Sequence, residues 1–376
     1  MKKYVVILML ILAILLPFFA LKDCEKAAEP DCLSFRSEYF RIVQFTDFHE
    51  WMAQEGEHSS AVFELRGTLK PALEEYIDTV LDIYRPDLAV LTGDNIFPLS
   101  FLYDLTYKVG ANTYKRIGQI FEEREQYWTL TFGNHDSECV ADKEDLLEAV
   151  KDNKYFVGGS GNITEYRSFT YSGTDDNGVM DIRLANFSIP IYGNGNSIAY
   201  NIYLFDSGSY NYVPDASIPY RYILDEQADW YKNVSSALKE GNGGNSVPSV
   251  AFTHIPLFEH EEAYLQGGEH IGVWTGSSPS DTRSRIFEDM LTQGDVRAIF
   301  TGHNHSNSIT CFYRRDDKKI MMGITPQAAA SGYESNDSTM RCRIIDLGKN
   351  GELSTFIDTS DPFYENRMEY GQTLTY

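Results

Sequence analysis

Five short apolar runs in this chain each end at a tight turn that carries aspartate, asparagine or histidine. Each run has the length and composition of a buried β-strand, and an amphipathic helix, Leu69 to Tyr84, separates the first two. A strand, a helix and a strand with polar residues at the strand ends is the pattern of a parallel βαβ unit, whose functional groups collect at the carboxyl edge of the sheet. The five runs are Tyr39–Thr46, Asp87–Thr92, Tyr127–Leu130, Ser249–Thr253 and Val296–Thr301.

The turns after these runs hold groups that can bind metals or move protons. Asp47 and His49 are two residues apart, so on an extended chain they point the same way and suit a divalent metal. The stretch Gly133-Asn134-His135-Asp136 offers an amide oxygen, an imidazole and a carboxylate. Five of the eight histidines fall in such turns, which chance rarely produces. The polar groups are, in order, Asp47, His49, Asp94, Asn134, His135, His254, His303 and His305.

In this order the turns resemble the motif blocks of the calcineurin-like metallophosphoesterases: Asp-x-His, Gly-Asp, Gly-Asn-His-Asp, a lone His and Gly-His-x-His. The blocks span Asp47 to His305. Thr253-His254-Ile255-Pro256 and similar stretches also resemble purple-acid-phosphatase relatives with a short catalytic domain. The resemblance implies an α/β fold, a four-layer α/β/β/α sandwich with two central mixed sheets.

Mapped onto this sequence, the resemblance implies a site for two divalent or mixed-valence metal ions, with Fe, Mn and Zn all possible. A carboxylate suits the position between two cations, and a water between the ions loses a proton near neutral pH and becomes the nucleophile. His135 would then serve the leaving group, and Asp136 would either orient His135 or cap the turn. The implied ligands are Asp47, His49, Asp94 and His305 for one ion, and Asp94, Asn134, His254 and His303 for the other, with Asp94 bridging.

One residue departs from the purple acid phosphatase pattern. These enzymes carry a tyrosine ligand three residues after the bridging aspartate, where this chain has Phe97. A phenylalanine cannot bind a metal, so the departure argues against a purple chromophore and an obligatory ferric ion.

The predicted function is metal-dependent hydrolysis of a phosphate monoester. A phosphodiesterase with the same site and a catalytically inactive binding module are the alternatives. The substrate would be a small phosphate ester or a phosphorylated macromolecule, because a net charge of -23 argues against a nucleic-acid duplex. Loops at 207–222 and 260–280 would shape specificity, although exposed loop residues are the commoner explanation of their composition. Candidate contacts in them are Tyr220, His260, His270 and Trp274.

The remaining segments predict one catalytic domain at residues 39–360 rather than two, since no Pro/Ser-rich linker divides it. Short β segments between residues 155 and 212 supply part of a second sheet. Residues 260–280 lack periodicity and are predicted to form a long loop. Further helices are expected at Tyr114–Gln126, Asp142–Lys151, Leu224–Leu238 and Thr282–Leu291, and further strands at Arg167–Tyr171, Met180–Phe187, Ser197–Phe205, Ile309–Arg314, Lys319–Ile324 and Met340–Asp346.

The N-terminal segment predicts export. Lys2 and Lys3 precede an apolar run from Tyr4 to Leu21, which is typical of a signal peptide or signal anchor over residues 1–21. The protein would be secreted or extracytoplasmic; with a signal anchor, residues 4–21 would hold it in a membrane. A polar linker at 22–38 and a C-terminal tail at 361–376 flank the domain.

Five cysteines fit an oxidising compartment. Cys311 and Cys342 both lie on strand-like segments and are the predicted disulfide pair, although sequence does not determine connectivity.

Overall fold

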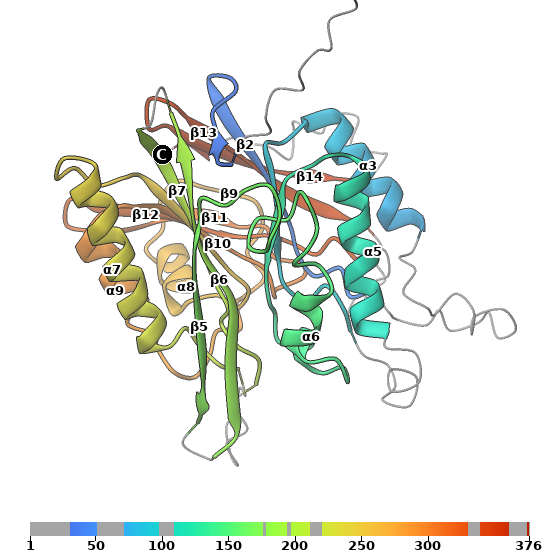
Figure 1. The fold of residues 1–376 in the computed structure, drawn as a ribbon. Coiled ribbons are helices and arrows are strands. Elements are labelled where there is room, and N and C mark those ends of the chain that lie inside the picture. The colour runs from blue at the N-terminus through green and yellow to red at the C-terminus, as the bar shows by residue number, and fades with distance from the viewer. Residues whose placement is uncertain are drawn as a thin grey trace, which may run out of the picture. The chain divides into compact units, whose positions relative to one another are not determined.

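Two mixed β-sheets form the centre of the unit that comprises Cys32–Tyr376. The computed structural model describes residues 31–50, 71–97, 109–175, 178–193, 197–210, 220–329, 339–360 and 374–375. Side chains of both sheets belong to one buried hydrophobic cluster, and helices cover the outer faces (Figure 1). The predicted four-layer α/β/β/α sandwich is therefore confirmed.

The first sheet contains the strands that follow one another early in the chain. Its order in the described residues is β15-β14-β13-β2-β3-β4. The strands β2, β3 and β4 run parallel, and β13, β14 and β15 pair antiparallel beside them. Their bounds are Tyr39–Phe45 (β2), Leu88–Thr92 (β3), Trp128–Thr131 (β4), Arg341–Gly348 (β13), Leu353–Thr359 (β14) and Leu374–Thr375 (β15).

The second sheet is built mainly from the middle of the chain. Its order in the described part is β1-β6-β7-β8-β10-β12-β11-β9, with β5 also paired to β6. The strands β7, β8, β10 and β12 are parallel. The bounds are Leu33–Ser34 (β1), Arg167–Thr174 (β5), Met180–Tyr192 (β6), Ile198–Phe205 (β7), Ser249–Thr253 (β8), His270–Ile271 (β9), Val296–Thr301 (β10), Thr310–Arg315 (β11) and Lys318–Ile324 (β12).

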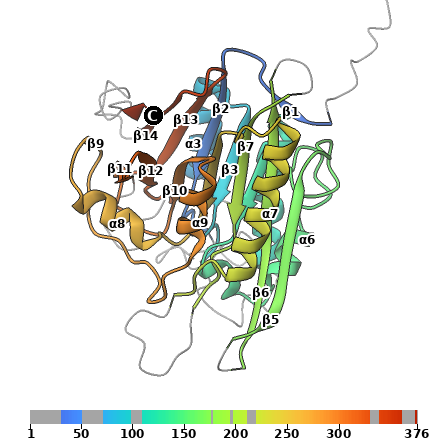
Figure 2. The same cartoon turned by 90° about the vertical axis from the view of Figure 1, so that its left-hand side faces the viewer.

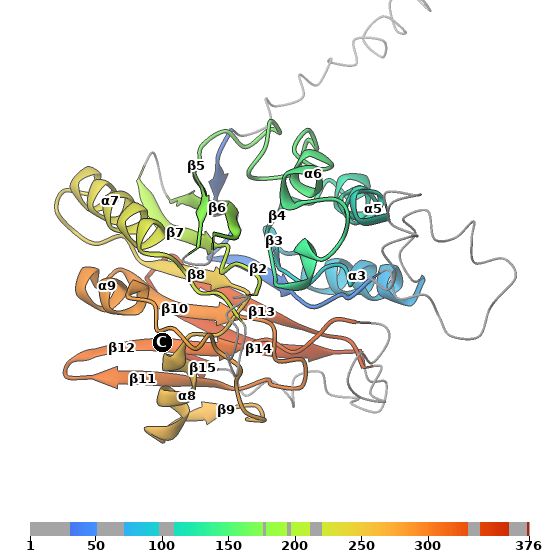
Figure 3. The same cartoon turned by 90° about the horizontal axis from the view of Figure 1, so that it is seen from below.

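Helices lie on both outer faces of the sheet pair. The helices α3 and α5 pack on the side of β2 to β4, whereas α7, α8 and α9 cover the second sheet (Figures 2 and 3). Leu73, Ile77 and Val80 recur at helical spacing on α3 and are buried against the core. The described helices are α3 (Pro71–Tyr84), α5 (Val109–Glu123), α6 (Lys143–Glu148), α7 (Asp225–Gly241), α8 (Phe258–Leu265), α9 (Ile286–Gln293) and the short 3-10 helix η1 (His135–Ser137).

Polar side chains tie the two sheets together below the ligand-bearing edge. Gln44 on β2 donates to the Thr301 carbonyl of β10 at 3.2 Å and accepts from Thr325 Oγ1 at 2.7 Å. The buried Arg343 guanidinium of β13 donates to Thr310 Oγ1 at 2.7 Å across the same interface. These bonds satisfy groups that would otherwise be buried without partners, and they hold the carboxyl ends of β2 and β10 side by side.

Several predicted boundaries need correction. The predicted loop 260–280 begins inside α8, whose apolar Ala263 is buried in the outer cluster although the helix shows little periodicity. Leu33–Ser34 pairs with β6, so the folded unit begins at Cys32 within the predicted linker. The strand β14 had no counterpart in the prediction, and β15 lies within the predicted tail.

The predicted disulfide between Cys311 and Cys342 is wrong. Successive residues of a strand point to opposite faces, and Cys311 faces the cluster beneath α8 and α9. Cys342 belongs to the other cluster, whereas its neighbour Arg343 is the residue that reaches across to the second sheet. The two thiols are not bonded to each other.

Among the described helices, none combines the length and the apolar composition that a bilayer crossing requires. The predicted signal or anchor segment at residues 4–21 lies outside the described residues.

Candidate dinuclear metal centre

The seven predicted ligands lie together where the carboxyl ends of five parallel strands meet. Three of these strands belong to the first sheet and two to the second, so the site sits at the junction of both. Asp47 and His49 follow β2, Asp94 follows β3, Asn134 follows β4, His254 follows β8, and His303 and His305 follow β10.

Asp47, His49 and His305 form the first group of ligand atoms. The Nε2 atoms of His49 and His305 are 3.0 Å apart. Asp47 Oδ1 lies 3.5 Å from His49 Nε2 and 3.4 Å from His305 Nε2. Atoms that bind one ion at about 2.1 Å, at angles of about 90–110°, are separated by about 3.0–3.4 Å. The three atoms are therefore spaced as ligands of one cation.

Asp94, His254 and His303 form the second group. Asp94 Oδ2 lies 3.1 Å from His254 Nε2, and Asn134 Oδ1 lies 3.2 Å from the same nitrogen. His254 Nδ1 donates to the Thr92 carbonyl at 2.8 Å, so the Nε2 lone pair faces the site. A hydrogen bond to the ring nitrogen that faces away from the site fixes the orientation of the ring and its tautomer.

The two carboxylates each keep one oxygen for a cation. Asp47 Oδ2 accepts from Thr46 Oγ1 at 2.7 Å and from the His303 N–H at 2.9 Å, and Asp94 Oδ1 accepts from the His135 N–H at 2.8 Å. Asp47 Oδ1 and Asp94 Oδ2 are buried and accept no hydrogen bond from a backbone or hydroxyl group within the described chain; each faces imidazole nitrogens of the other ligands instead. Buried anionic oxygens without donors are costly, and two metal ions would satisfy them. The residues present fit such ions.

Charge interactions across the site are strong. Burial opposes protonation of His254, but the Asp94 and Asp47 carboxylates prevail and raise its pKa to about 9. Burial lowers the pKa of His303 to about 3. A cation that binds the second group must therefore displace a proton from His254, which couples binding to pH.

Four ligands have strained backbones. Asp47, His49, Asp94 and His303 have φ angles of 54°, 44°, 51° and 71°, in the left-handed region that non-glycine residues rarely adopt. Hydrogen bonds from Asp47 N to Gly93 O and from His49 N to Asp94 O, both 3.0 Å, hold two of these turns. Such strain persists only where the surroundings enforce it, and it clusters at functional sites.

The glycines of two motif blocks have a steric role. A Cβ atom at Gly93, whose φ is +94°, would collide with the Gly133 backbone. A Cβ at Gly133 would collide with Asp94. The ends of β3 and β4 therefore approach this closely only because both residues are glycine.

Asp136 holds these two turns together. Its carboxylate accepts from the N–H groups of Asp94 at 2.8 Å, Gly133 at 2.8 Å, Asn95 at 3.0 Å and Ile96 at 3.4 Å. These bonds favour the turn-capping role over the orientation of His135. The group that contacts His135 is instead Glu138, whose Oε2 lies 2.8 Å from His135 Nδ1.

Burial opposes protonation of His135, but the Asp94 and Glu138 carboxylates raise its pKa above the ordinary value. The ring therefore favours the form that can donate a proton. Glu138 and Tyr210 are not predicted from the sequence. Tyr210 Oη lies 3.2 Å from His135 Nδ1. The i, i+3 spacing of His135 and Glu138 on a short helix was the available signal.

A cavity of about 540 Å³ opens onto the ligands. Asp94, His135 and His303 lie at its base, and neutral polar side chains line much of the rest, among them Tyr210, Tyr220, Thr275, Ser277, Ser278, Asn304 and Ser306. Lysine and arginine are not among the described lining residues. The cavity is large enough for an organic group beyond the phosphate.

Of the candidate contacts, only Tyr220 lines this cavity in the described structure. Its ring meets the His303 ring edge-on, with centroids 4.5 Å apart. His260 is fully buried in α8, and the exposed His270 belongs to β9. Trp274 stacks on Tyr264 with centroids 4.7 Å apart. The prediction that His260 contacts the substrate is wrong, because its imidazole is part of the core.

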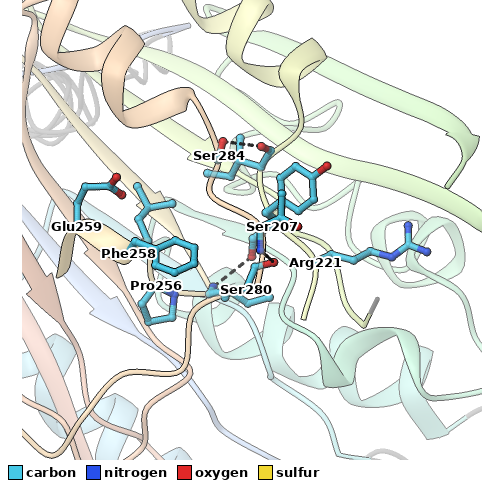
Figure 4. A pocket seen from close by; sticks show the side chains of 12 residues that line it. Ser207, Arg221, Pro256, Phe258, Glu259, Ser280 and Ser284 are labelled. Carbon is cyan, nitrogen blue, oxygen red and sulfur yellow. Dashed lines mark hydrogen bonds between the residues drawn. The ribbon is translucent and has the colours of Figure 1, made fainter. Parts of the chain in front are cut away.

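Serine hydroxyls bond to the backbone beside Tyr220 and around a small hollow next to it; Figure 4 labels Ser207, Ser280 and Ser284 in this hollow. Ser280 Oγ donates to the Tyr220 carbonyl at 2.8 Å, and Ser284 Oγ donates to the Ile223 carbonyl at 2.6 Å. Ser207 Oγ accepts from the Ile255 N–H at 3.1 Å. The small hollow among them, of about 10 Å³, has room for about one water.

Phe97 lies at the edge of the metal centre. Its ring meets His135 edge-on with centroids 4.6 Å apart, and it meets His49 at 5.8 Å. The position that would carry a tyrosine ligand is thus beside the first group and supplies no oxygen.

The chain matches a known family model and is similar to several plant proteins. The family model described as calcineurin-like phosphoesterase matches residues 40–307. The chain is 25% identical over 250 residues to "Probable inactive purple acid phosphatase 29" of Arabidopsis thaliana, covering 62% of this chain and 58% of the relative. It is 26% identical over 294 residues to "Probable inactive purple acid phosphatase 28" of the same plant, covering 73% and 68%.

A yeast protein and a solved structure are also similar. "Phosphatase DCR2" of Saccharomyces cerevisiae is 25% identical over 296 residues, covering 74% of this chain and 45% of the relative. The chain thus spans 45% to 68% of the length of these three relatives. A dimetal phosphatase from Danio rerio superposes with a TM-score of 0.51 at 10% identity, covering 90% of this chain and 99% of that one, which shows a shared fold.

Proposed function

The chain belongs to the calcineurin-like phosphoesterase family, and we propose that it hydrolyses a phosphate monoester at a dinuclear metal centre. The observation that carries this proposal is the pair of ligand groups, each with a buried carboxylate oxygen that faces the imidazole nitrogens of the same group. When bound, two cations supply Lewis acidity, which lowers the pKa of water and neutralises phosphate oxygens.

The side chains around the cations have separate tasks in this proposal. Asp47, His49 and His305 would hold one ion. Asn134, His254 and His303 would hold the other, and Asp94 would be shared by both. His135 Nε2, which lies 4.0 Å from Asp94 Oδ2, would donate a proton to the leaving oxygen as the P–O bond breaks.

Two other functions use the same residues. A phosphodiester would fit the same ions, so the ester class must be measured. A binding module without catalysis is suggested by the relatives that are named inactive. The complete ligand set, the strained ligand backbones and the proton donor beside the metal site support catalysis, because binding alone would not require them.

Metal analysis and an ester panel test the proposal. Purified protein should contain two equivalents of Fe, Mn, Zn or a mixture, and the metal-loaded protein should hydrolyse chromogenic monoesters faster than diesters. Faster cleavage of diesters would support the phosphodiesterase. Full activity in a chelated, metal-free sample would exclude the metal-dependent mechanism.

Asp94→Asn removes the charge of the proposed bridge. We expect metal content to fall and hydrolysis to drop by about two orders of magnitude or more, because both ions lose a ligand. Elemental analysis and initial rates measure both effects. Asp281→Asn makes the same change at an exposed site outside the centre and should behave as wild type. Normal metal content in Asp94→Asn would contradict the bridging role.

A further inference from the structure

Glu138 lies beside His135 because of the short helix that joins them. The helix η1 is a 3-10 helix, and its three residues per turn bring side chains i and i+3 to the same side. The Glu138 N–H donates to the His135 carbonyl at 3.0 Å, and Glu138 Oε2 lies 2.8 Å from His135 Nδ1. Asp136, between them, is engaged by the backbone N–H groups of the turns.

A carboxylate at this distance selects the imidazole form that carries its proton on Nδ1. His135 Nδ1–H then donates to Glu138, and Nε2 is directed to the metal side of the ring. In the protonated ring Nε2 also carries a hydrogen, and the proton taken by the leaving oxygen comes from this nitrogen as the P–O bond breaks. This leaves a neutral ring with its proton on Nδ1, and Nε2 regains a proton from water.

Tyr210 connects the same histidine to a metal ligand. Asn134 Nδ2 donates to Tyr210 Oη at 2.8 Å, and this oxygen lies 3.2 Å from His135 Nδ1. An amide can present its oxygen or its nitrogen to a cation, and this bond occupies the nitrogen. Asn134 Oδ1 is thereby directed to His254 Nε2, at 3.2 Å.

Ion pairs hold the backbone of Tyr210 in this place. Arg221 Nε donates to the Tyr210 carbonyl at 2.8 Å. The Arg221 guanidinium in turn pairs with Asp175 at 3.0 Å and with Asp181 at 2.5 Å, on the β5–β6 hairpin.

We propose that Glu138 and Tyr210 are positioning residues for this reaction. Glu138 orients His135 toward the leaving oxygen, and Tyr210 orients the Asn134 oxygen toward the second cation. The catalytic part of the inference rests on the proposed function. The two orientations can be measured independently of it.

Glu138 is tested with a leaving-group series. We expect Glu138→Ala to lower kcat by roughly tenfold to a hundredfold for alkyl phosphates, whose leaving oxygen needs a proton. The loss should be much smaller for nitrophenyl phosphate, whose leaving group departs without one, and metal content should be unchanged. Glu138→Gln keeps a neutral acceptor and should fall between wild type and Glu138→Ala. Glu144→Gln, an exposed glutamate of α6, is the matched control. Equal losses across the series would overturn the role of Glu138.

Tyr210 is tested by metal affinity. Tyr210→Phe should lower the affinity for one of the two ions by roughly tenfold in a chelator competition with Zn²⁺ or Mn²⁺. The affinity for the other ion should not change. Its effect on kcat should be the same for all leaving groups. Tyr39→Phe, at the opposite end of β2 and 48% exposed, is the control. Unchanged affinity at both ions would overturn the role of Tyr210.

Histidine ¹⁵N spectra separate this inference from the proposed function. His135 should carry its proton on Nδ1 when neutral in wild type and in Glu144→Gln, and should lose this preference in Glu138→Ala. A wild-type ring protonated on Nε2 alone would overturn the orientation by Glu138. If wild type hydrolyses no phosphate ester with any metal, the proposed function fails, while the spectra and the metal titration still decide the two positioning roles.

Discussion

Single residues of the metal centre combine strain with fixed hydrogen bonds. Asp47 and Asp94 have left-handed backbones, and each uses one carboxylate oxygen for donors from the protein. Their ligand oxygens are thus directed before any cation arrives, which lowers the cost of ordering the site. The same principle applies to His254, whose Nδ1–H is held by the Thr92 carbonyl.

Phe97 should leave the iron-loaded protein without a purple colour. A purple acid phosphatase derives its colour from charge transfer between a tyrosine oxygen and ferric iron, and the ring beside His49 here carries no oxygen. The iron-loaded protein should therefore be active and lack a strong band in the middle of the visible range. A visible spectrum checks this, with Phe97→Tyr for comparison. A strong band in wild type would mean that another tyrosine binds the iron.

At the scale of elements, the loop after β9 is attached to the segment that carries His303 and His305. The Ser278 N–H donates to Asn304 Oδ1 at 3.3 Å, and Asn307 Nδ2 donates to the Gly276 carbonyl at 2.5 Å. The Val273 N–H donates to Ser308 Oγ at 2.9 Å. The polar rim of the cavity is therefore built on the ligand segment itself.

Asn307→Ala should change substrate binding without changing the metal centre. Asn307 is fully buried, and loss of its bond frees the loop, at a cost of about 1 kcal/mol, or roughly a fivefold rise in KM. Steady-state kinetics and metal analysis measure the two effects. Asn242→Ala, which removes a bond to the Asn245 carbonyl at the end of α7, should leave KM unchanged. A lower kcat at constant KM would contradict this separation.

His260, near the start of α8, should make the stability of the protein depend on pH in the acid range. His260 Nδ1 accepts the Leu257 N–H at 3.2 Å, and burial lowers the pKa of His260 to about 4. The unfolded chain binds this proton near pH 6.5, so stability is complete above that pH and falls as the pH drops toward 4, by about 3 kcal/mol from this group. Urea unfolding between pH 7 and 4.5 should show this loss.

His260→Gln removes the titrating group, so the free energy of unfolding should fall less between pH 7 and 4.5 than in wild type. The difference should equal the contribution of His260, even if the variant is less stable at pH 7. His270→Gln changes an exposed histidine on β9 and should keep the wild-type slope. Parallel pH profiles for wild type and His260→Gln would show that His260 does not account for the acid sensitivity.

At the scale of the whole molecule, the metal centre joins two sheets. Its ligands come from β2, β3 and β4 on one side and from β8 and β10 on the other. Cations held there would stabilise the contact between the sheets, which otherwise depends on the shared hydrophobic cluster and the bonds of Gln44 and Arg343.

Metal should therefore raise the melting temperature. A ligand at a hundredfold its Kd adds about 2.7 kcal/mol per site, so Tm should rise with added metal and fall when a chelator removes it. Calorimetry at several metal concentrations measures the shift. Asp94→Asn should respond more weakly, and Asp281→Asn should respond as wild type. A Tm that changes with neither metal nor chelator would contradict a site shared between the sheets.

The order of the strands that bear ligands follows from the sequence, because apolar runs ending in polar turns are local signals. It also indicated the sandwich and the two-metal site through the family resemblance. Short or weakly periodic elements such as β1, α8 and β14 were not predicted, since tertiary packing stabilises them more than local propensity does.

Only the tertiary structure decided which groups meet. The face of each strand depends on its register, so Cys311 and Cys342 could not be separated by sequence, although each lies on a predicted strand. The contacts of Tyr210 with Asn134 and His135 join residues about 75 positions apart in the sequence. Local sequence patterns do not predict contacts over such separations. The chemistry of single motifs is local, whereas the hydrogen bonds that orient their side chains depend on how both sheets pack.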